Sequence, residues 1–277
     1  MLPRLAALLL AGFQLAAAAT AVATEAPDPY PGAAAAYAVM VNGVVLWERA
    51  AHEPLPPASL TKIMTAVLLL EEWMSAGGEP AAVLTVSAKA ASTIGSRLGL
   101  RTGERMRVTD ALTAMLVASA NDACLALAEH AAGSVDAFVA RMNRRAEGLG
   151  LGATRFVNPC GLDAPGHRSS VADLLRLSRH AMEIPGFASR VALREASVAT
   201  LGGRRFRLES GNQLLGRVDG AVGIKSGFTG RAGKCLSALV RRGRDEVLVV
   251  LLNAPDRWWS ADVLIEDAFA ALDASRR

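Results

Sequence analysis

A serine and a lysine stand three positions apart where a buried helix is expected to begin. Pro56 and Pro57 end the preceding segment, and the apolar run 63–70 predicts the helix body. Residues three apart share a helix face, so Ser59 and Lys62 should lie about one turn apart. A lysine removed from water prefers its neutral form and can accept the serine proton. The spacing therefore predicts a nucleophile with its own base, at a helix start whose free N–H groups suit an oxyanion.

The same spacing also has an ordinary explanation, in which Ser59 caps the helix and Lys62 is solvated in its first turn. A second motif shifts the balance. Ser119-Ala120-Asn121 interrupts two apolar helices, 110–117 and 123–132, and a break holding polar side chains needs a reason. A plain turn between helices, capped by Asp122 or Asn121, would explain that motif alone.

A third motif begins the C-terminal strand pattern. Lys225 and Ser226 stand beside Gly227, and an amine and a hydroxyl at this position suit a carboxylate ligand. Gly227 would let such a ligand approach the backbone, and the strand edge could pair with an extended peptide. An ordinary edge strand with an exposed lysine is the alternative for this motif alone.

The elements that must position these residues are strands at both ends of the chain and helices between them. Two apolar segments, 37–41 and 44–47, flank Asn42-Gly43, which favours a type I′ hairpin. Strands are also expected at 224–230, 235–240 and 246–252, followed by a closing helix over 256–272. Further helices are expected at 135–149 and 171–182, with Thr109 and Ser169 or Ser170 as caps, and a short helix or turn at 85–87.

This order predicts an α/β fold with one antiparallel sheet built from both chain ends and flanked by helices. A helical lobe at about 59–185 would be inserted within a single catalytic domain, 36–277. The chain has 277 residues, 52% of them hydrophobic, enough for one large core or two lobes. The net charge is +4, basic residues are scattered and aromatic residues make up 5%, so we expect no nucleic-acid partner.

The N-terminus has the pattern of an export signal. Arg4 precedes an apolar stretch, 5–19, and Ala21-Val22-Ala23 is a small-residue cleavage site. We therefore expect a signal peptide at 1–23, a flexible leader at 24–35, and export to the periplasm or cell-wall space. An uncleaved membrane anchor is the alternative; no second hydrophobic span is evident, so no anchor is expected after cleavage.

Three cysteines, Cys124, Cys160 and Cys235, lie among apolar or small residues. Export permits disulfides, but the count is odd and the spacing fits no metal site. Buried thiols are the default expectation, with one pair left open.

The three motifs occur in the order found in class A β-lactamases and penicillin-binding proteins. Longer matches make the chain resemble the serine D-alanyl-D-alanine carboxypeptidases, the low-molecular-mass penicillin-binding proteins, from about Tyr37 to Leu252. These matches are Pro57-Ala-Ser-Leu-Thr-Lys-Ile-Met-Thr65, Ser119-Ala-Asn-Asp-Ala-Cys124, Phe156-Val-Asn-Pro159 with Gly161-Leu162-Asp163, and Val218-Asp219-Gly220 with Gly223-Ile-Lys-Ser-Gly-Phe-Thr229. The resemblance implies a β-lactamase/transpeptidase-like fold and hydrolysis of peptidoglycan stem peptides ending in D-Ala-D-Ala. It also implies covalent inhibition by β-lactam antibiotics, a place in cell wall biogenesis, and a mechanism without metal or cofactor.

Roles carried over by the resemblance follow the motif positions. Ser59 would be the nucleophile, Lys62 its general base, and Ser119 the relay of a proton to the leaving D-alanine amine. Asn121 would bind the substrate's backbone amide. The terminal carboxylate would bind Lys225 and Ser226, and the N–H groups of Ser59 and Phe228 would form the oxyanion hole. Gly227 would also belong to the substrate-binding residues.

The chain also departs from the family pattern. Ser226 stands where many members have Thr, which should be a mild change. Phe228 stands where some have His, so altered substrate preference is expected, and Cys160 stands where His is frequent. The C-terminal β-rich domain and amphipathic anchor of some relatives are not expected here.

Four other functions compete with this interpretation. A class A β-lactamase needs a glutamate for deacylation. The acids between Asn143 and Ser170 are Glu147 and Asp163, and neither stands in a Glu-x-x-Leu-Asn motif, so efficient β-lactam hydrolysis is not expected. A peptidoglycan D,D-endopeptidase would use the same residues and stays open. A non-catalytic cell-wall binder should have lost the serine or lysine. A zinc peptidase is disfavoured because the histidines lack ligand spacing; they are His52, His130, His167 and His180.

Overall fold

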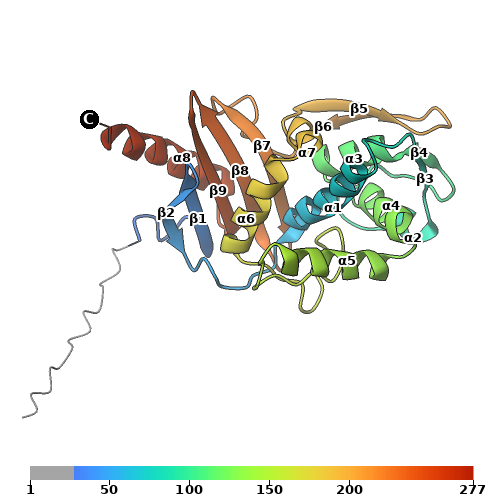
Figure 1. Cartoon of the computed structure of the whole chain (residues 1–277), viewed down its shortest axis with the longest axis horizontal. Coiled ribbons are helices and arrows are strands. Elements are labelled where there is room, and N and C mark those ends of the chain that lie inside the picture. Colours follow the sequence, from blue (N-terminus) through green and yellow to red (C-terminus); the bar gives the residue numbers. More distant parts are fainter. Residues whose placement is uncertain (1–27, 277) are drawn as a thin grey trace, which may run out of the picture.

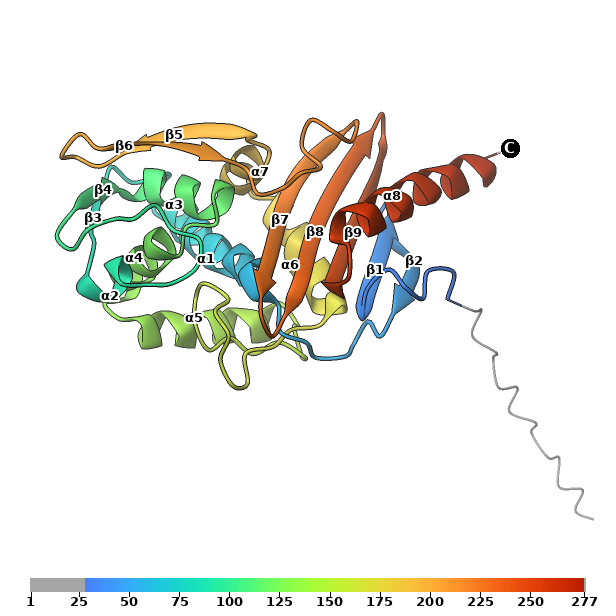
Figure 2. The same cartoon turned by 180° about the vertical axis from the view of Figure 1, so that it is seen from behind.

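The computed structural model of the chain describes residues 28–276 (Figure 1). The predicted signal peptide, 1–23, and the start of the predicted leader lie outside the described residues. Helices gather at one end of the molecule and a five-stranded antiparallel sheet stands at the other, as Figures 1 and 2 show from opposite sides.

Both ends of the chain build the sheet, as predicted. Its strand order is β2-β1-β9-β8-β7. Strand β1 pairs along its whole length with β9, from Ala36 opposite Leu252 to Val41 opposite Val247. The strands are β1 (Ala36–Val41), β2 (Val44–Arg49), β7 (Ala221–Thr229), β8 (Gly233–Arg242) and β9 (Asp245–Ala254).

Both faces of the central strands are covered, which explains why β9 is a continuous apolar run. Val249 and Leu251 pack with α8 (Arg257–Ala274) on one face. Val250 and Leu252 belong to the larger core between the other face and the helical lobe. Helix α6 (Val171–Met182) lies on this second face, and its N-cap Ser170 accepts the Asp173 N–H as predicted.

The helical lobe is built around α1, whose side chains are buried on nearly every side. A short 3₁₀ turn, η1, leads directly into it. The lobe's helical elements are η1 (Ala58–Leu60), α1 (Thr61–Ser75), α2 (Ala88–Ala91), α3 (Val108–Val117), α4 (Asn121–Ala132), α5 (Val135–Gly148) and α7 (Pro185–Val191). Within residues 28–276 no single helix is long and apolar enough to span a membrane, although α4 and α5, bent by 85°, reach that length and composition together.

Two small two-stranded sheets stand beside the large one and were not among the strands expected by residue range. They pair β3 (Val83–Thr85) with β4 (Arg105–Arg107) and β5 (Glu195–Ala199) with β6 (Arg205–Glu209). The short helix expected to start at 85–87 is α2, which is capped by Ser87, although Thr85 itself ends β3. The predicted Thr109 cap is wrong, because β4 runs straight into α3, which begins at Val108 without a side-chain cap.

Residues 28–35, expected to belong to a flexible leader, pack against the sheet. The Tyr30 ring lies 5.0 Å from that of Trp47, and the Tyr37 hydroxyl donates to Asp28. Ala33 and Ala34 are buried. This segment is therefore an ordered part of the fold.

Candidate active site

Ser59 lies in the η1 turn, pressed against strand β7. Its neighbour Ala58 has a positive φ of 48°, a strained conformation for a residue with a side chain. A Cβ added at Gly227 would lie 2.8 Å from the Ser59 nitrogen and 2.9 Å from the Ala58 Cβ. Gly227 is thus required by the close approach of η1, and the ligand approach suggested by the sequence stays a prediction.

The Lys62 amine is buried, with an exposed fraction of 0%. Its Nζ lies 3.0 Å from the Ser59 Oγ, 2.7 Å from the Asn121 Oδ1 and 2.7 Å from the Cys160 carbonyl oxygen. Burial, and then the nearby positive charge of Lys225, holds the Lys62 pKa well below its usual value. Burial and the neighbouring charge therefore favour the neutral form of the amine, which lies within hydrogen-bonding distance of the Ser59 hydroxyl.

Asn121 is the first residue of α4, and protein groups already engage its amide. The Oδ1 accepts from Lys62, and the Nδ2 donates to the Ile94 carbonyl at 2.6 Å. A contact with a substrate amide would have to use the second lone pair of Oδ1 or the second N–H.

Ser119 precedes this helix in the left-handed backbone region, with φ of 58°. Its hydroxyl makes no hydrogen bond within residues 28–276, so the structure does not join it directly to Lys62 or Lys225. The predicted relay through Ser119 stays a prediction.

Strand β7 supplies a second buried lysine. Lys225 is 3% exposed, and its Nζ donates to the Ser226 carbonyl at 2.9 Å. Burial, and then the charge of Arg257, lowers the Lys225 pKa to about 7. The Ser226 Oγ donates to the Gly211 carbonyl at 3.0 Å. This amine is thus poised between its neutral and charged forms.

Arg257, at the start of α8, was missed from the sequence. Its Nη1 donates to the Gly227 carbonyl on β7, and its guanidinium lies 4.7 Å from the centre of the Trp258 ring. Its Nε is buried and unpartnered within the described part of the chain. Arg257 therefore adds a second, incompletely paired cation beside Lys225.

Phe228 follows Gly227 on β7, opposite Lys234 of β8. Its side chain is 65% exposed. The predicted oxyanion role concerns its backbone N–H, which a bulky exposed side chain leaves unchanged. The exposed Phe228 ring is an apolar surface next to Gly227, which packs against Ser59.

The loop at 157–168 lies against α1 and forms one side of the site. The Asn158 Oδ1 accepts three backbone N–H groups, at Cys160, Gly161 and Leu162. Thr65 of α1 donates to the Pro159 carbonyl at 2.6 Å. These contacts fix the Cys160 carbonyl that Lys62 meets.

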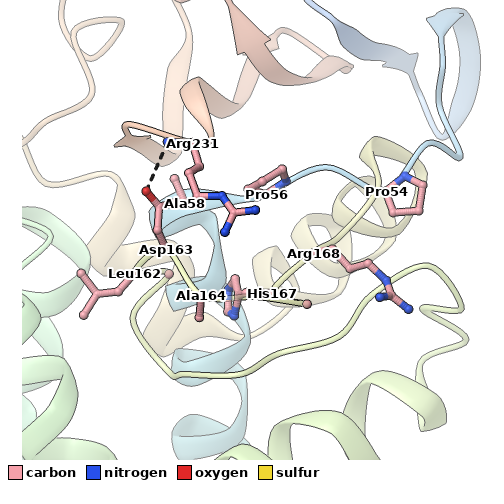
Figure 3. Close-up of a pocket in the computed structure, with 11 residues that line it drawn as sticks. Pro54, Pro56, Ala58, Leu162, Asp163, Ala164, His167, Arg168 and Arg231 are labelled. Carbon is pink, nitrogen blue, oxygen red and sulfur yellow. Dashed lines mark hydrogen bonds between the residues drawn. The ribbon is translucent and has the colours of Figure 1, made fainter.

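The same loop is joined to the end of β7. Asp163 accepts from the Thr229 hydroxyl at 2.6 Å and from the Arg231 backbone N–H at 3.2 Å. Figure 3 shows the contact with Arg231, and both residues line a cavity of about 220 Å³. The carboxylate of Asp163 is thus engaged in holding the loop, which gives it a structural task in place of the water-activating role weighed for a β-lactamase.

His167 packs in this loop against the start of α1. Its Nδ1 accepts the Val157 N–H at 2.9 Å, and its Nε2 lies 2.8 Å from the Thr61 Oγ1. The Thr61 hydroxyl donates to the Ala58 carbonyl at 2.8 Å, so the Nε2 must carry the imidazole proton. Burial, partly opposed by Asp163, lowers the His167 pKa to about 4. The ring is therefore neutral and fixes the strained turn before Ser59.

The cysteines depart from the default expectation. Cys124 of α4 and Cys160 of the loop form a disulfide, whereas Cys235 is a free, buried thiol. The expectation of buried thiols is right for Cys235 and wrong for the other two. Their 36-residue separation gave no sign of pairing, because only the packing of α4 on the loop brings them together.

The D-alanyl-D-alanine carboxypeptidase family (peptidase S11) matches residues 21–256. The chain belongs to this family. The match includes all three motifs, and the sheet with its helical lobe has the β-lactamase/transpeptidase-like architecture that the sequence predicted.

Individual relatives and a solved structure are also similar to this chain. The chain is 35% identical to D-alanyl-D-alanine carboxypeptidase DacF of Bacillus subtilis over 77% of its own length and 55% of the relative. It is 32% identical to a D-alanyl-D-alanine endopeptidase of Pseudomonas aeruginosa, over 77% of this chain and 68% of that one. The Streptomyces K15 DD-transpeptidase has the same fold, with a TM-score of 0.79 and 26% identity over 86% of this chain and 97% of that one. The chain spans about half the length of several relatives that it matches, DacF among them.

Proposed function

We propose that this protein is a serine D,D-carboxypeptidase that removes the terminal D-alanine from peptidoglycan stem peptides through an acyl-enzyme. One observation carries the proposal: a buried amine, with its pKa held well below normal, lies 3.0 Å from the hydroxyl of Ser59. A neutral amine at this distance can take the serine proton while the serine attacks a carbonyl. Family membership supports the same reaction.

The acylation step uses groups from both sides of the site. Ser59 Oγ bonds to the carbonyl carbon of the penultimate D-alanine, and its proton passes to Lys62. The N–H groups of Ser59 and Phe228 would receive the negative charge on the carbonyl oxygen. The proton then goes to the leaving D-alanine amine, with Ser119 as the proposed relay, and water later frees the acyl group from Ser59.

The substrate's terminal carboxylate is proposed to bind between Lys225, Ser226 and Arg257. Lys225 is buried, and Arg257 is half-buried with a buried, unpartnered Nε; neither has a carboxylate partner within the described residues, which favours an anionic ligand because an unpaired buried charge is costly. Such a ligand would raise the Lys225 pKa above its value of about 7 and keep the amine charged. β-Lactams carry a carboxylate in the matching position and are proposed as covalent inhibitors.

Ser59→Ala tests the proposal. Wild-type protein should be labelled covalently by a fluorescent penicillin and should release D-alanine from diacetyl-Lys-D-Ala-D-Ala. The variant should lose both activities while keeping its circular dichroism spectrum and melting temperature. Persistent labelling of the variant would remove Ser59 as the nucleophile.

A D,D-endopeptidase is the second candidate, supported by the relative of that name in Pseudomonas aeruginosa. It would cut the D-alanyl crosslink between two stem peptides with the same residues. Purified crosslinked muropeptide dimers, compared with pentapeptide monomers by chromatography, distinguish the two. Faster turnover of the dimer would favour the endopeptidase.

We also propose that the protein acts outside the cytoplasm, in the periplasm or cell-wall space. The Cys124–Cys160 disulfide supports this, because disulfides persist in oxidising compartments. The N-terminal export pattern supports it independently. Fractionation of cells and the N-terminal mass of the exported protein test it; a cytoplasmic, full-length product would contradict it.

A further inference from the structure

The Cys124–Cys160 disulfide joins two segments that both contact Lys62. Cys160 itself supplies the carbonyl oxygen 2.7 Å from the Lys62 Nζ. Cys124 lies one helical turn after Asn121, whose Oδ1 is the other carbonyl acceptor at 2.7 Å. Both cysteines are buried, with exposed fractions of 0% and 1%. The covalent bond therefore fixes the spacing between the two acceptors.

The number of hydrogens on a neutral amine gives this arrangement its chemical meaning. A neutral lysine amine has two N–H bonds and one lone pair. The Asn121 and Cys160 oxygens accept one N–H each, so the lone pair is left for the third neighbour, the Ser59 hydroxyl at 3.0 Å. If either acceptor moved, the amine could rotate and turn an N–H towards Ser59 instead.

Noncovalent contacts hold each acceptor on its own segment. Asn158 and Thr65 fix the loop around Cys160, and the Ile94 carbonyl fixes the amide of Asn121. The direct link between the two segments is the disulfide, supplemented by a long contact of 3.8 Å from the Cys160 Sγ to the Asn121 carbonyl.

We propose that the Cys124–Cys160 disulfide is a positioning element for catalysis, which holds the two acceptors so that the Lys62 lone pair faces Ser59. This inference rests on the proposed function, because it assigns the disulfide a task in Ser59 acylation. It concerns this chain in particular, since Cys160 stands where the resemblance led us to expect His.

The test begins with a count of thiols. Alkylation of the unfolded, non-reduced protein should modify one cysteine, Cys235, by mass spectrometry. Modification of all three cysteines would overturn the inference.

The second step compares acylation rates. In Cys124→Ala/Cys160→Ala, the rate constant for acylation by a fluorescent penicillin should fall roughly 10–100-fold, as expected for a reacting group misplaced by about 1 Å. The acid limb of its pH profile should move to higher pH, because water reaching the amine favours the ammonium form; the charge of Lys225, which faces Lys62 from β7, is unchanged.

Leu264→Ala is the matched control, since it opens a cavity in the core between α8 and the sheet, remote from Lys62. It should lower the melting temperature while leaving the rate and the acid limb unchanged. A double cysteine variant that behaves like this control has lost stability alone and would overturn the inference.

Wild-type protein provides the same comparison without any substitution, should the double variant fail to fold. Folded protein is partly reduced with a phosphine, its thiols are alkylated, and a short penicillin pulse follows. Intact mass then resolves acylated reduced from acylated oxidised molecules in one sample. Slower acylation of the reduced molecules supports the inference, and equal rates overturn it. Absence of labelling at Ser59 in the oxidised protein would instead refute the proposed function and this inference with it.

Discussion

Two buried lysines face the site from different parts of the molecule, and their surroundings differ. Lys62, on the helical side, has two carbonyl acceptors and a hydroxyl around its amine. Lys225, on the sheet side, donates to the neighbouring backbone carbonyl and lies near the cation of Arg257. Both have lowered pKa values because both are buried, and the value of Lys62 is depressed further by the charge of Lys225.

This difference teaches that burial alone does not assign a role. We propose that Lys62 acts as the base, because its surroundings favour the neutral amine, whereas Lys225, with a pKa of about 7, stays close enough to its charged form to bind an anion. The charge state of Lys62 depends on Lys225, because the positive charge of Lys225 disfavours a second positive charge on Lys62. We therefore propose that the two lysines divide the work, with proton transfer at Lys62 and carboxylate binding at Lys225.

Lys62→Met tests the base directly and should give the largest effect. The rate constant for acylation by penicillin should fall by about 10²–10⁴-fold, the usual contribution of general base catalysis. Stopped-flow fluorescence measures it. Near-normal acylation would assign proton removal to another group and would end the proposed division of roles.

Lys225→Met should give a smaller effect of a different kind. Loss of a charged hydrogen bond to the substrate carboxylate should lower kcat/KM for the D-Ala-D-Ala peptide by roughly 10–100-fold, mainly through KM. The same peptide with a terminal carboxamide is the control and should be affected much less. An equal loss of kcat/KM on both peptides would show that Lys225 does not bind the substrate carboxylate.

The pH profile sharpens the comparison without removing either amine. Lys225 loses its charge as the pH rises through about 7, so wild-type kcat/KM for the carboxylate substrate should decline above that pH. Lys225→Arg keeps a cation and should move this alkaline limb to higher pH. The two profiles are measured by D-alanine release; an identical limb in both enzymes would assign it to a group other than Lys225.

A third buried base, His167, should have the smallest effect on activity and a measurable effect on stability. Its folded pKa of about 4 lies below the unfolded value of 6.5, so the unfolded chain binds more protons between these values. Its stabilising contribution is complete above pH 6.5 and falls as the pH drops towards 4, by about 2–3 kcal/mol.

Urea unfolding of wild type and His167→Gln at pH 7 and pH 4.5 measures this loss. The variant lacks the titrating ring, so the gap between the two proteins should narrow at pH 4.5. A gap independent of pH would mean that His167 stabilises the fold by packing alone.

The sequence predicted those parts of the site that follow from local spacing. Ser59 and Lys62 lie one helical turn apart, and β7 brings Lys225 and Ser226 to the same place because both chain ends enter one sheet. Alternating and continuous apolar runs located the strands, and Ser170 showed where α6 begins.

Other features depend on contacts between segments far apart in the sequence, so they could not be predicted from local sequence patterns. Arg257 becomes a site residue because α8 docks on the sheet beneath β7. The Cys124–Cys160 pair requires α4 to rest on the loop. The very short β3 and β4 strands carry too few residues for a period of two to be recognised. In each case tertiary packing, rather than local preference, decides the outcome.

The contact between Gly227 and Ser59 has a consequence for how the protein can be assayed. Ser59, the proposed nucleophile, lies early in the sequence, whereas strand β7, which packs against it, lies near the end. A single methyl group added at Gly227 would keep the two segments apart. A partly folded or misassembled molecule therefore has Ser59 and Lys62, but it lacks the proposed pairing of the Ser59 and Phe228 N–H groups around the carbonyl oxygen. Covalent labelling by penicillin should count only molecules in which the first and last segments have docked, which makes the reaction a reporter of completed folding during refolding or export.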